Sequence, residues 1–123
     1  MNILLDTNIV IYFLKGEMNV VQNASKAENI AIFFITEIEL NCYDVLPEES
    51  GKIRSFLKQI EIFYPDSTTV KHTINIRKST RLKLPDAIIC AQSRQHDYVL
   101  FSNDKKILNN TKVLSVLNPL FEF

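Results

Sequence analysis

The first eight residues constrain the fold most strongly, because an apolar run leads directly into Asp-Thr-Asn. Residues 3–5 predict a short strand buried on both faces, and the apolar residues that begin at Ile9 predict a helix immediately after it. Asp6 therefore stands at a strand-to-helix junction, with Thr7 or Asn8 as the expected helix cap. Ligands bind beyond the carboxyl ends of parallel strands, which makes Asp6 a candidate functional acid, while a local capping role is the alternative.

The same junction recurs further along the chain. Residues 30–35 predict a second interior strand, followed by Thr36 as a helix-cap candidate and by Glu39 at the capping-box position. Residues 98–101 predict another buried strand, which leads to Asp104 and a short helix. Strands that alternate with helices predict an α/β sandwich with a mainly parallel sheet, in one domain over residues 1–123.

The middle of the chain supplies more helices and an edge strand. Pro47 is expected to open a helix, and residues 62–64 are short enough for an edge or third strand. Residues 68–80 show the spacing of an amphipathic helix. Pro85 fits the first position of the next helix and places Asp86 in its first turn, where a carboxylate is also favourable for the helix alone.

Composition excludes several classes of protein. Lys plus Arg and Asp plus Glu balance at 14 each, so any nucleic-acid binding requires a local basic patch. The apolar runs are far shorter than the ~20 residues that span a bilayer, and Met1 leads into the first strand without a secretory signal, so we expect a cytoplasmic protein. Cys42 and Cys90 lack metal-ligand spacing and are expected to be core thiols.

Four carboxylates are predicted to gather at one edge of the sheet. Right-handed crossovers bring the ends of parallel strands together, and they would collect most of Asp6, Glu39, Asp86 and Asp104 there. Converging carboxylates repel one another and lose hydration. A divalent cation such as Mg²⁺, which prefers oxygen ligands, relieves that repulsion, so the pattern predicts a metal site.

Four motifs, taken in order, resemble those of a PIN domain. They are Leu-Asp-Thr-Asn at residues 5–8, Ile-Thr-Glu-Ile-Glu-Leu at 35–40, Leu-Pro-Asp-Ala-Ile-Ile-Cys-Ala at 84–91, and Leu-Phe-Ser-Asn-Asp-Lys-Lys at 100–106. Each motif alone is weak, but their order and spacing are specific and cover nearly the whole chain. More narrowly, they resemble the small VapC-type toxins of toxin-antitoxin modules.

The resemblance implies a three-layer α/β/α sandwich and an endoribonuclease that depends on Mg²⁺, with Mn²⁺ as a substitute. It implies Asp6, Asp86 and Asp104 as the principal metal ligands in an acidic site that also includes Glu39, which would bind the metal or orient water. Glu37 is set aside, because it lies two residues from Glu39 and cannot share its helix face. The expected reaction is hydrolysis of an RNA phosphodiester by a metal-activated water.

Supporting residues and partners follow from the same resemblance. Asn8 and Ser102 are expected to provide polar support to the acids. The family resemblance also implies a homodimer and a cognate antitoxin protein that covers the acidic groove. Several aromatic residues are candidates for partner contacts, although most aromatics belong to cores: Tyr12, Phe13, Tyr43 and Tyr64.

A basic run precedes Asp86 and has two interpretations. It is either a solvated surface or a set of contacts to RNA phosphates, together with Lys105 and Lys106. The residues of the run that would bind RNA are Arg77, Lys78, Arg81 and Lys83.

Two other function classes stay open. A catalytically silent PIN-fold module could bind RNA or protein without cleaving it. A phosphatase or phosphotransfer domain with Asp6 as nucleophile fits less well, because Asn8 stands where a second acid is expected. His72 and His96 join no metal-ligand spacing and are expected to have no catalytic role.

Overall fold

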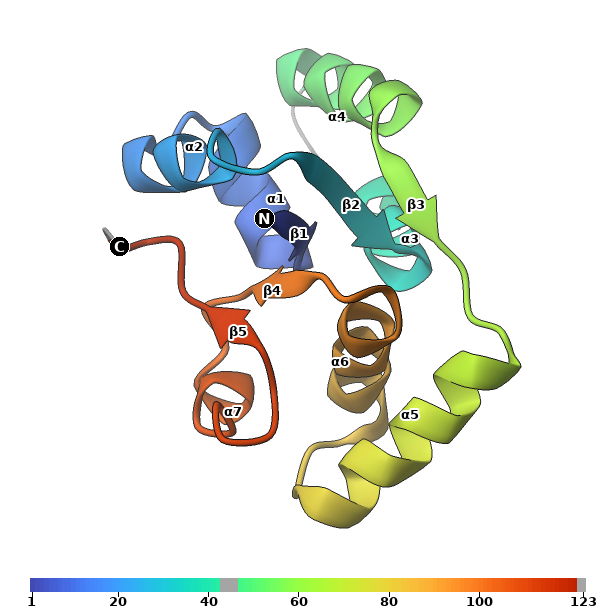
Figure 1. Ribbon diagram of the computed structural model, residues 1–123. Coiled ribbons are helices and arrows are strands. Elements are labelled where there is room, and N and C mark those ends of the chain that lie inside the picture. Colours follow the sequence, from blue (N-terminus) through green and yellow to red (C-terminus); the bar gives the residue numbers. More distant parts are fainter. Residues whose placement is uncertain (43–46, 122–123) are drawn as a thin grey trace.

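The sheet at the centre of the molecule is parallel throughout the residues that the computed structural model describes, 1–42 and 47–121. Its order in this part of the chain is β3-β2-β1-β4-β5 (Figure 1). The first strand is central and pairs with both β2 and β4, so that Leu4 lies beside Ala31 and Leu100. The strands are β1 (Asn2–Leu5), β2 (Asn29–Phe33), β3 (Glu61–Phe63), β4 (Val99–Phe101) and β5 (Val116–Leu117).

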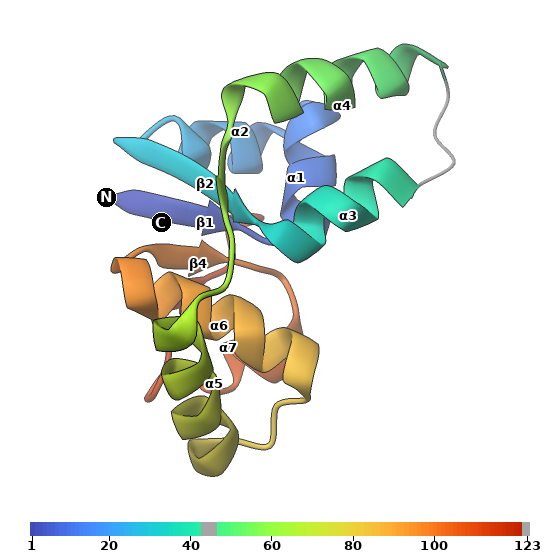
Figure 2. The ribbon, with the colours of Figure 1, turned by 90° about the vertical axis from the view of Figure 1, so that its right-hand side faces the viewer.

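Helices cover both faces of the sheet. Figure 2 shows α1, α2 and α4 on one side and α5, α6 and α7 on the other. The predicted three-layer α/β/α sandwich with a parallel central sheet is therefore confirmed. The helices are α1 (Thr7–Leu14), α2 (Met18–Ala24), α3 (Phe34–Cys42), α4 (Pro47–Gln59), α5 (Ser67–Ser79), α6 (Leu84–His96) and α7 (Lys105–Leu108).

Alternating side chains of β1 divide the core into two clusters. Leu4 packs in one cluster with residues of α6 such as Ala87 and Ala91, whereas Ile3 and Leu5 pack in the other with residues of α1 and α2. All three β1 side chains are fully buried, which explains the uninterrupted apolar run. Truncating one of them to alanine would cost about 2 to 5 kcal/mol of stability, so the strand before Asp6 is a rigid support.

The helix starts differ from the sequence-based expectations. Asp6 itself is the N-cap of α1, and its carboxylate accepts a hydrogen bond from the backbone N–H of Thr7. Thr36 does not cap α3, because β2 ends at Phe33 and the helix follows at once, which leaves Thr36 inside it. Pro85 is the second residue of α6 rather than the first. Local propensity identified the junctions but placed the helix starts one to three residues too late.

The expectation that both cysteines are core thiols was half wrong. Cys90 is buried on α6, but Cys42 is exposed at the end of α3. Residues 43–46 lie outside the described residues, and with them the candidate partner contact at Tyr43. Among the described residues, helices are too short or too polar to cross a membrane.

Candidate functional site

The acids are brought together where the central strands end. Asp6 follows β1, Asp104 follows β4 after a short turn, and α3 begins directly after β2. Helix α6 runs antiparallel to the strand β4 that follows it, so that its first turn, with Asp86, reaches the same side of the molecule (Figure 2). Four different elements thus contribute one predicted acidic residue each.

Asp6 is held by two hydrogen bonds in a largely buried position. Its Oδ1 accepts from the backbone N–H of Thr7 at 2.9 Å, and its Oδ2 accepts from the Ser102 hydroxyl at 2.8 Å. Burial raises the pKa of the Asp6 carboxyl, the two hydrogen bonds oppose this shift, and the charges of Asp86 and Asp104 raise the pKa further. The structure therefore keeps this carboxylate in place at an electrostatic cost.

Asp86, in the first turn of α6, and Asp104, at the start of α7, lie close enough for the charge of Asp104 to affect Asp86. Burial raises the pKa of the half-buried Asp86 carboxyl, as does the charge of Asp104, whereas Lys106 and Lys83 lower it. Asp104 caps α7 by accepting a 2.9 Å hydrogen bond from the backbone N–H of Lys106. Its own N–H donates to Ser102 Oγ at 3.1 Å, so one buried serine links Asp104 to Asp6.

Thr7 connects Glu39 to the site by hydrogen bonds to both Glu39 and Asp6. The Thr7 hydroxyl donates a 2.7 Å hydrogen bond to Glu39 Oε1 and lies 2.9 Å from the hydroxyl of Thr36. Glu37, which we excluded from the acidic site on sequence grounds, instead accepts a 2.9 Å hydrogen bond from the hydroxyl of Tyr64. Sequence reasoning paired Thr36 with Glu39 only as a capping box and treated Thr7 only as a helix cap. It therefore missed the contacts of Thr7 with Glu39 and Thr36, which come from a distant part of the chain.

Cys90 lies beneath the acids on α6. Burial and the charges of Asp86, Asp6 and Asp104 raise the pKa of its thiol to about 12. The thiol of the metal-free protein therefore stays protonated at neutral pH.

The donor set suits a hard divalent cation. No group of three or more His, Cys, Asp or Glu side chains among residues 1–42 and 47–121 is arranged to hold a metal ion by itself. The fit rests on donor chemistry: Asp6, Asp86 and Asp104 present oxygen ligands and are close enough for their charges to raise the pKa of neighbouring carboxyls. A bound cation would remove that repulsion, and Mg²⁺ keeps several waters of its own.

A basic groove opens beside Asp86, between the end of α5 and α7. Its volume is about 810 Å³, and polar residues such as Thr80 and Asn110 share its lining. The cations that line it are Lys78, Arg81, Lys83 and Lys106. Arg77 is exposed on α5 and is not among the lining residues, and Asn8 is exposed in the first turn of α1.

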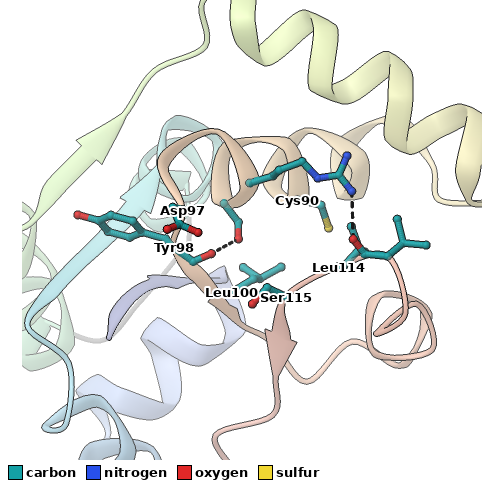
Figure 3. Close-up of a pocket in the computed structure, with 9 residues that line it drawn as sticks. Cys90, Asp97, Tyr98, Leu100, Leu114 and Ser115 are labelled. Atoms are coloured by element: carbon teal, nitrogen blue, oxygen red, sulfur yellow. Dashed lines mark hydrogen bonds between the residues drawn. The ribbon is translucent and has the colours of Figure 1, made fainter.

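A smaller pocket of about 200 Å³ lies at the other end of α6 (Figure 3). Its labelled residues come from α6, the turn that follows it, β4 and the segment before β5, and Cys90 is among the residues that line it. Its arginine, Arg94, already donates to Asn75 Oδ1 at 2.8 Å and to the carbonyl of Val113 at 3.1 Å. We therefore place the candidate functional site at the acids and the basic groove.

Comparison with known proteins agrees with this architecture. No curated protein matches the sequence. Among solved structures, a chain of a toxin-antitoxin complex from Klebsiella pneumoniae is 26% identical, with 98% of each chain covered and a TM-score of 0.80. A chain of VapBC-1 from nontypeable Haemophilus influenzae is 19% identical, with 98% of this chain and 100% of that chain covered and a TM-score of 0.80.

A third structure, VapBC2 from Rickettsia felis bound to a promoter DNA fragment, is 20% identical over 96% of this chain and 98% of that chain, with a TM-score of 0.77. At these identities the last two show a shared fold. The family model for the PIN domain matches residues 3–113, which include all four acids of the site. The parallel sheet, the acids at its carboxyl edge and this match agree, and the chain belongs to the PIN domain family.

Proposed function

We propose that this protein is a metal-dependent endoribonuclease and the toxin of a VapBC-type toxin-antitoxin pair. The observation that carries the proposal is the convergence of Asp6, Asp86 and Asp104 from three elements, close enough for their charges to interact. The basic groove beside them supports a polyanionic substrate. Membership in the PIN domain family and the likeness to a chain of a toxin-antitoxin complex support the same assignment.

Each acid has a distinct part in this proposal. Asp6, Asp86 and Asp104 would hold Mg²⁺, or Mn²⁺ in its place, and Glu39 would add a ligand or orient water. When bound, such an ion lowers the pKa of water and neutralises charge on a phosphoryl oxygen. Ser102 would keep the Asp6 carboxylate oriented through its hydrogen bond, and Asn8, exposed at the start of α1, would provide further polar support.

The basic groove would guide RNA to the acids. The charges of Lys83 and Lys106 lower the pKa of Asp86, so these lysines interact electrostatically with an acid of the site. Lys78 and Arg81 extend the positive lining, and Arg77 would continue it along α5. Such contacts position a phosphate backbone without reading its bases. The groove favours RNA contact over a merely solvated surface.

Partner contacts are part of the proposal as well. A cognate antitoxin would cover the acidic groove, and a second copy of the chain would form a homodimer. Tyr12 and Tyr64 are 37% and 59% exposed and are available to partners. Phe13 is a poorer candidate, because it packs against Phe56 with ring centroids 6.2 Å apart.

The decisive experiment is RNA cleavage by the purified chain with Mg²⁺ and with EDTA. We expect Asp6→Asn and Asp104→Asn to lose more than about 100-fold in activity, beyond the usual cost of losing an outer-shell partner. Asp97→Asn is the matched control, because Asp97 is exposed and its left-handed backbone (φ 58°) accommodates asparagine. Cleavage that persists in EDTA, or undiminished activity of both aspartate variants, would overturn the assignment.

A second measurement separates the competing functions and identifies the substrate. Hydrolysis of a phosphate monoester, with no cleavage of RNA, would instead indicate a phosphatase. Metal-independent RNA binding without cleavage would indicate a silent module. Mapping of cleavage ends across total RNA after brief induction, beside the Asp6→Asn variant, would then locate the target sequence.

A further inference from the structure

We propose that Thr7 and Thr36 form a hydroxyl relay that positions Glu39, an inference that rests on the proposed function. The relay joins α1 to α3 through two short hydrogen bonds. Thr7 Oγ1 donates to Glu39 Oε1 at 2.7 Å and lies 2.9 Å from Thr36 Oγ1. The two threonines are thus positioning residues, since the chemistry assigned to the site belongs to the acids.

The direction of the relay follows from counting protons. A carboxylate only accepts hydrogen bonds, and a threonine hydroxyl has a single proton to donate. Thr7 gives that proton to Glu39, so the hydrogen bond between the hydroxyls must be donated by Thr36. Thr36 therefore orients Thr7, and Thr7 in turn orients Glu39.

Burial makes the relay rigid. Thr7 is 5% exposed and Thr36 is fully buried, so water does not compete for these hydroxyls. Both residues are β-branched and have few rotamers available in a helix. The flexible Glu39 side chain, which is only partly buried, is thereby fixed by two stiff neighbours.

Thr7 also connects Glu39 with Asp6. Its backbone N–H donates to Asp6 Oδ1 at 2.9 Å, while its hydroxyl binds Glu39 Oε1. One residue in the first turn of α1 thus fixes two acids that come from different parts of the sequence. With Oε1 engaged, the second oxygen of Glu39 is left for a metal ion or for water.

The test is Mn²⁺ binding to the full chain, measured by isothermal titration calorimetry. Thr7→Val keeps the side-chain shape and removes the donor, and we expect it to weaken Mn²⁺ binding by about 10- to 100-fold. Thr7→Ser should restore the affinity, because it keeps the hydroxyl. Thr36→Val should weaken binding in the same direction by a smaller factor, since it acts through Thr7.

A double-mutant cycle identifies the path of the effect. In a Glu39→Ala background, Thr7→Val should cause no further loss of Mn²⁺ affinity. An undiminished loss in that background would show that Thr7 acts through Asp6 instead and would overturn the relay. Asp97→Asn serves as the control for an acidic residue outside the site.

Crystal structures of the metal-free protein separate this inference from the proposed function. In EDTA, Glu39 should leave its wild-type position in Thr7→Val and keep it in Thr7→Ser. If Glu39 moves in this way but wild type binds no Mn²⁺, the relay stands and the proposed metal chemistry fails. If Thr7→Val binds Mn²⁺ as wild type does and Glu39 stays in place, the relay is overturned while the proposed function stands. Thr36→Val supplies the same comparison if Thr7→Val does not fold.

Discussion

Ser102 donates a 2.8 Å hydrogen bond to Asp6 Oδ2 across 96 residues of sequence. The serine is fully buried and also accepts a hydrogen bond from the backbone N–H of Asp104. The hydroxyl proton of Ser102 therefore fixes the Asp6 carboxylate. Its oxygen fixes the turn that carries Asp104. A buried hydroxyl with both partners made is a rigid element of a polar site.

Removal of this hydroxyl should weaken the metal site. In Ser102→Ala, Asp6 loses a donor that lowers the pKa of its carboxyl, so that pKa should rise further and the carboxylate should be less well oriented. We expect about a 10- to 100-fold loss of Mn²⁺ affinity at pH 7, measured by calorimetry. Ser102→Thr keeps the hydroxyl and should bind like wild type; equal affinities for all three proteins would contradict the role of Ser102.

Asp6→Asn should stabilise the metal-free protein at neutral pH. The pKa of Asp6 is raised by folding above 3.8, so the folded protein binds more protons than the unfolded chain between the two pKa values. The free energy of unfolding therefore falls as pH rises through this window, and the loss is complete above the folded pKa. Asparagine at position 6 is uncharged, so it removes the free-energy cost of burying the carboxylate, and it can still cap α1.

Chemical denaturation in EDTA at several pH values measures the effect. We expect Asp6→Asn to exceed wild type at pH 7 by about 0.5 to 2 kcal/mol, and the gain to shrink as pH falls toward the unfolded pKa. Added Mn²⁺ should reverse the order, because it stabilises only a protein that binds it. If wild type were more stable than Asp6→Asn in EDTA at pH 7, the result would count against a raised pKa of Asp6.

Lysines of the basic groove should control the salt dependence of RNA binding. Each phosphate contact contributes about 0.7 to the slope of log affinity against log salt for single strands. Lys83→Gln and Lys106→Gln together should therefore reduce that slope by about 1.4. Fluorescence anisotropy with labelled single-stranded RNA in an Asp104→Asn background measures binding without cleavage. Lys15→Gln, at the far end of α1, is the control, and a slope unchanged by the groove variants would argue against the RNA path.

The two cysteines should differ in reactivity. Cys42 is exposed, whereas the Cys90 thiol is buried and its pKa is raised to about 12. Because the thiolate is the reactive form, iodoacetamide at pH 7.5 should modify Cys42 in the native protein and leave Cys90 untouched. Mass spectrometry should find both modified after denaturation. Native modification of Cys90 at a similar rate would show that the thiol is not shielded.

The interior strands and most helices were predictable from local patterns. The β1 side chains sit in a continuous apolar run because helices cover both faces of the sheet, and that run is visible in the sequence. The exposure of Cys42 was not predictable, because the residues after Thr36 indicate a helix without showing how far its last turn extends beyond the core. The boundary at Thr36 moved because β2 passes directly into α3 without a separate capping residue. Helix α6 begins one residue before Pro85, after Lys83, an N-cap that makes no side-chain hydrogen bond.

The apolar runs and the polar residues that follow them are visible in the sequence, and they mark four candidate acids: Asp6, Glu39, Asp86 and Asp104. Which of these acids interact depends on the folded chain, because their neighbours arrive by crossovers from distant parts of the sequence. The hydroxyls that hold Asp6 and Glu39 come from 96 and 32 residues away, at Ser102 and Thr7. Local propensity is fixed by neighbours in sequence, whereas the orientation and pKa of a carboxylate depend on burial and on charges nearby in space.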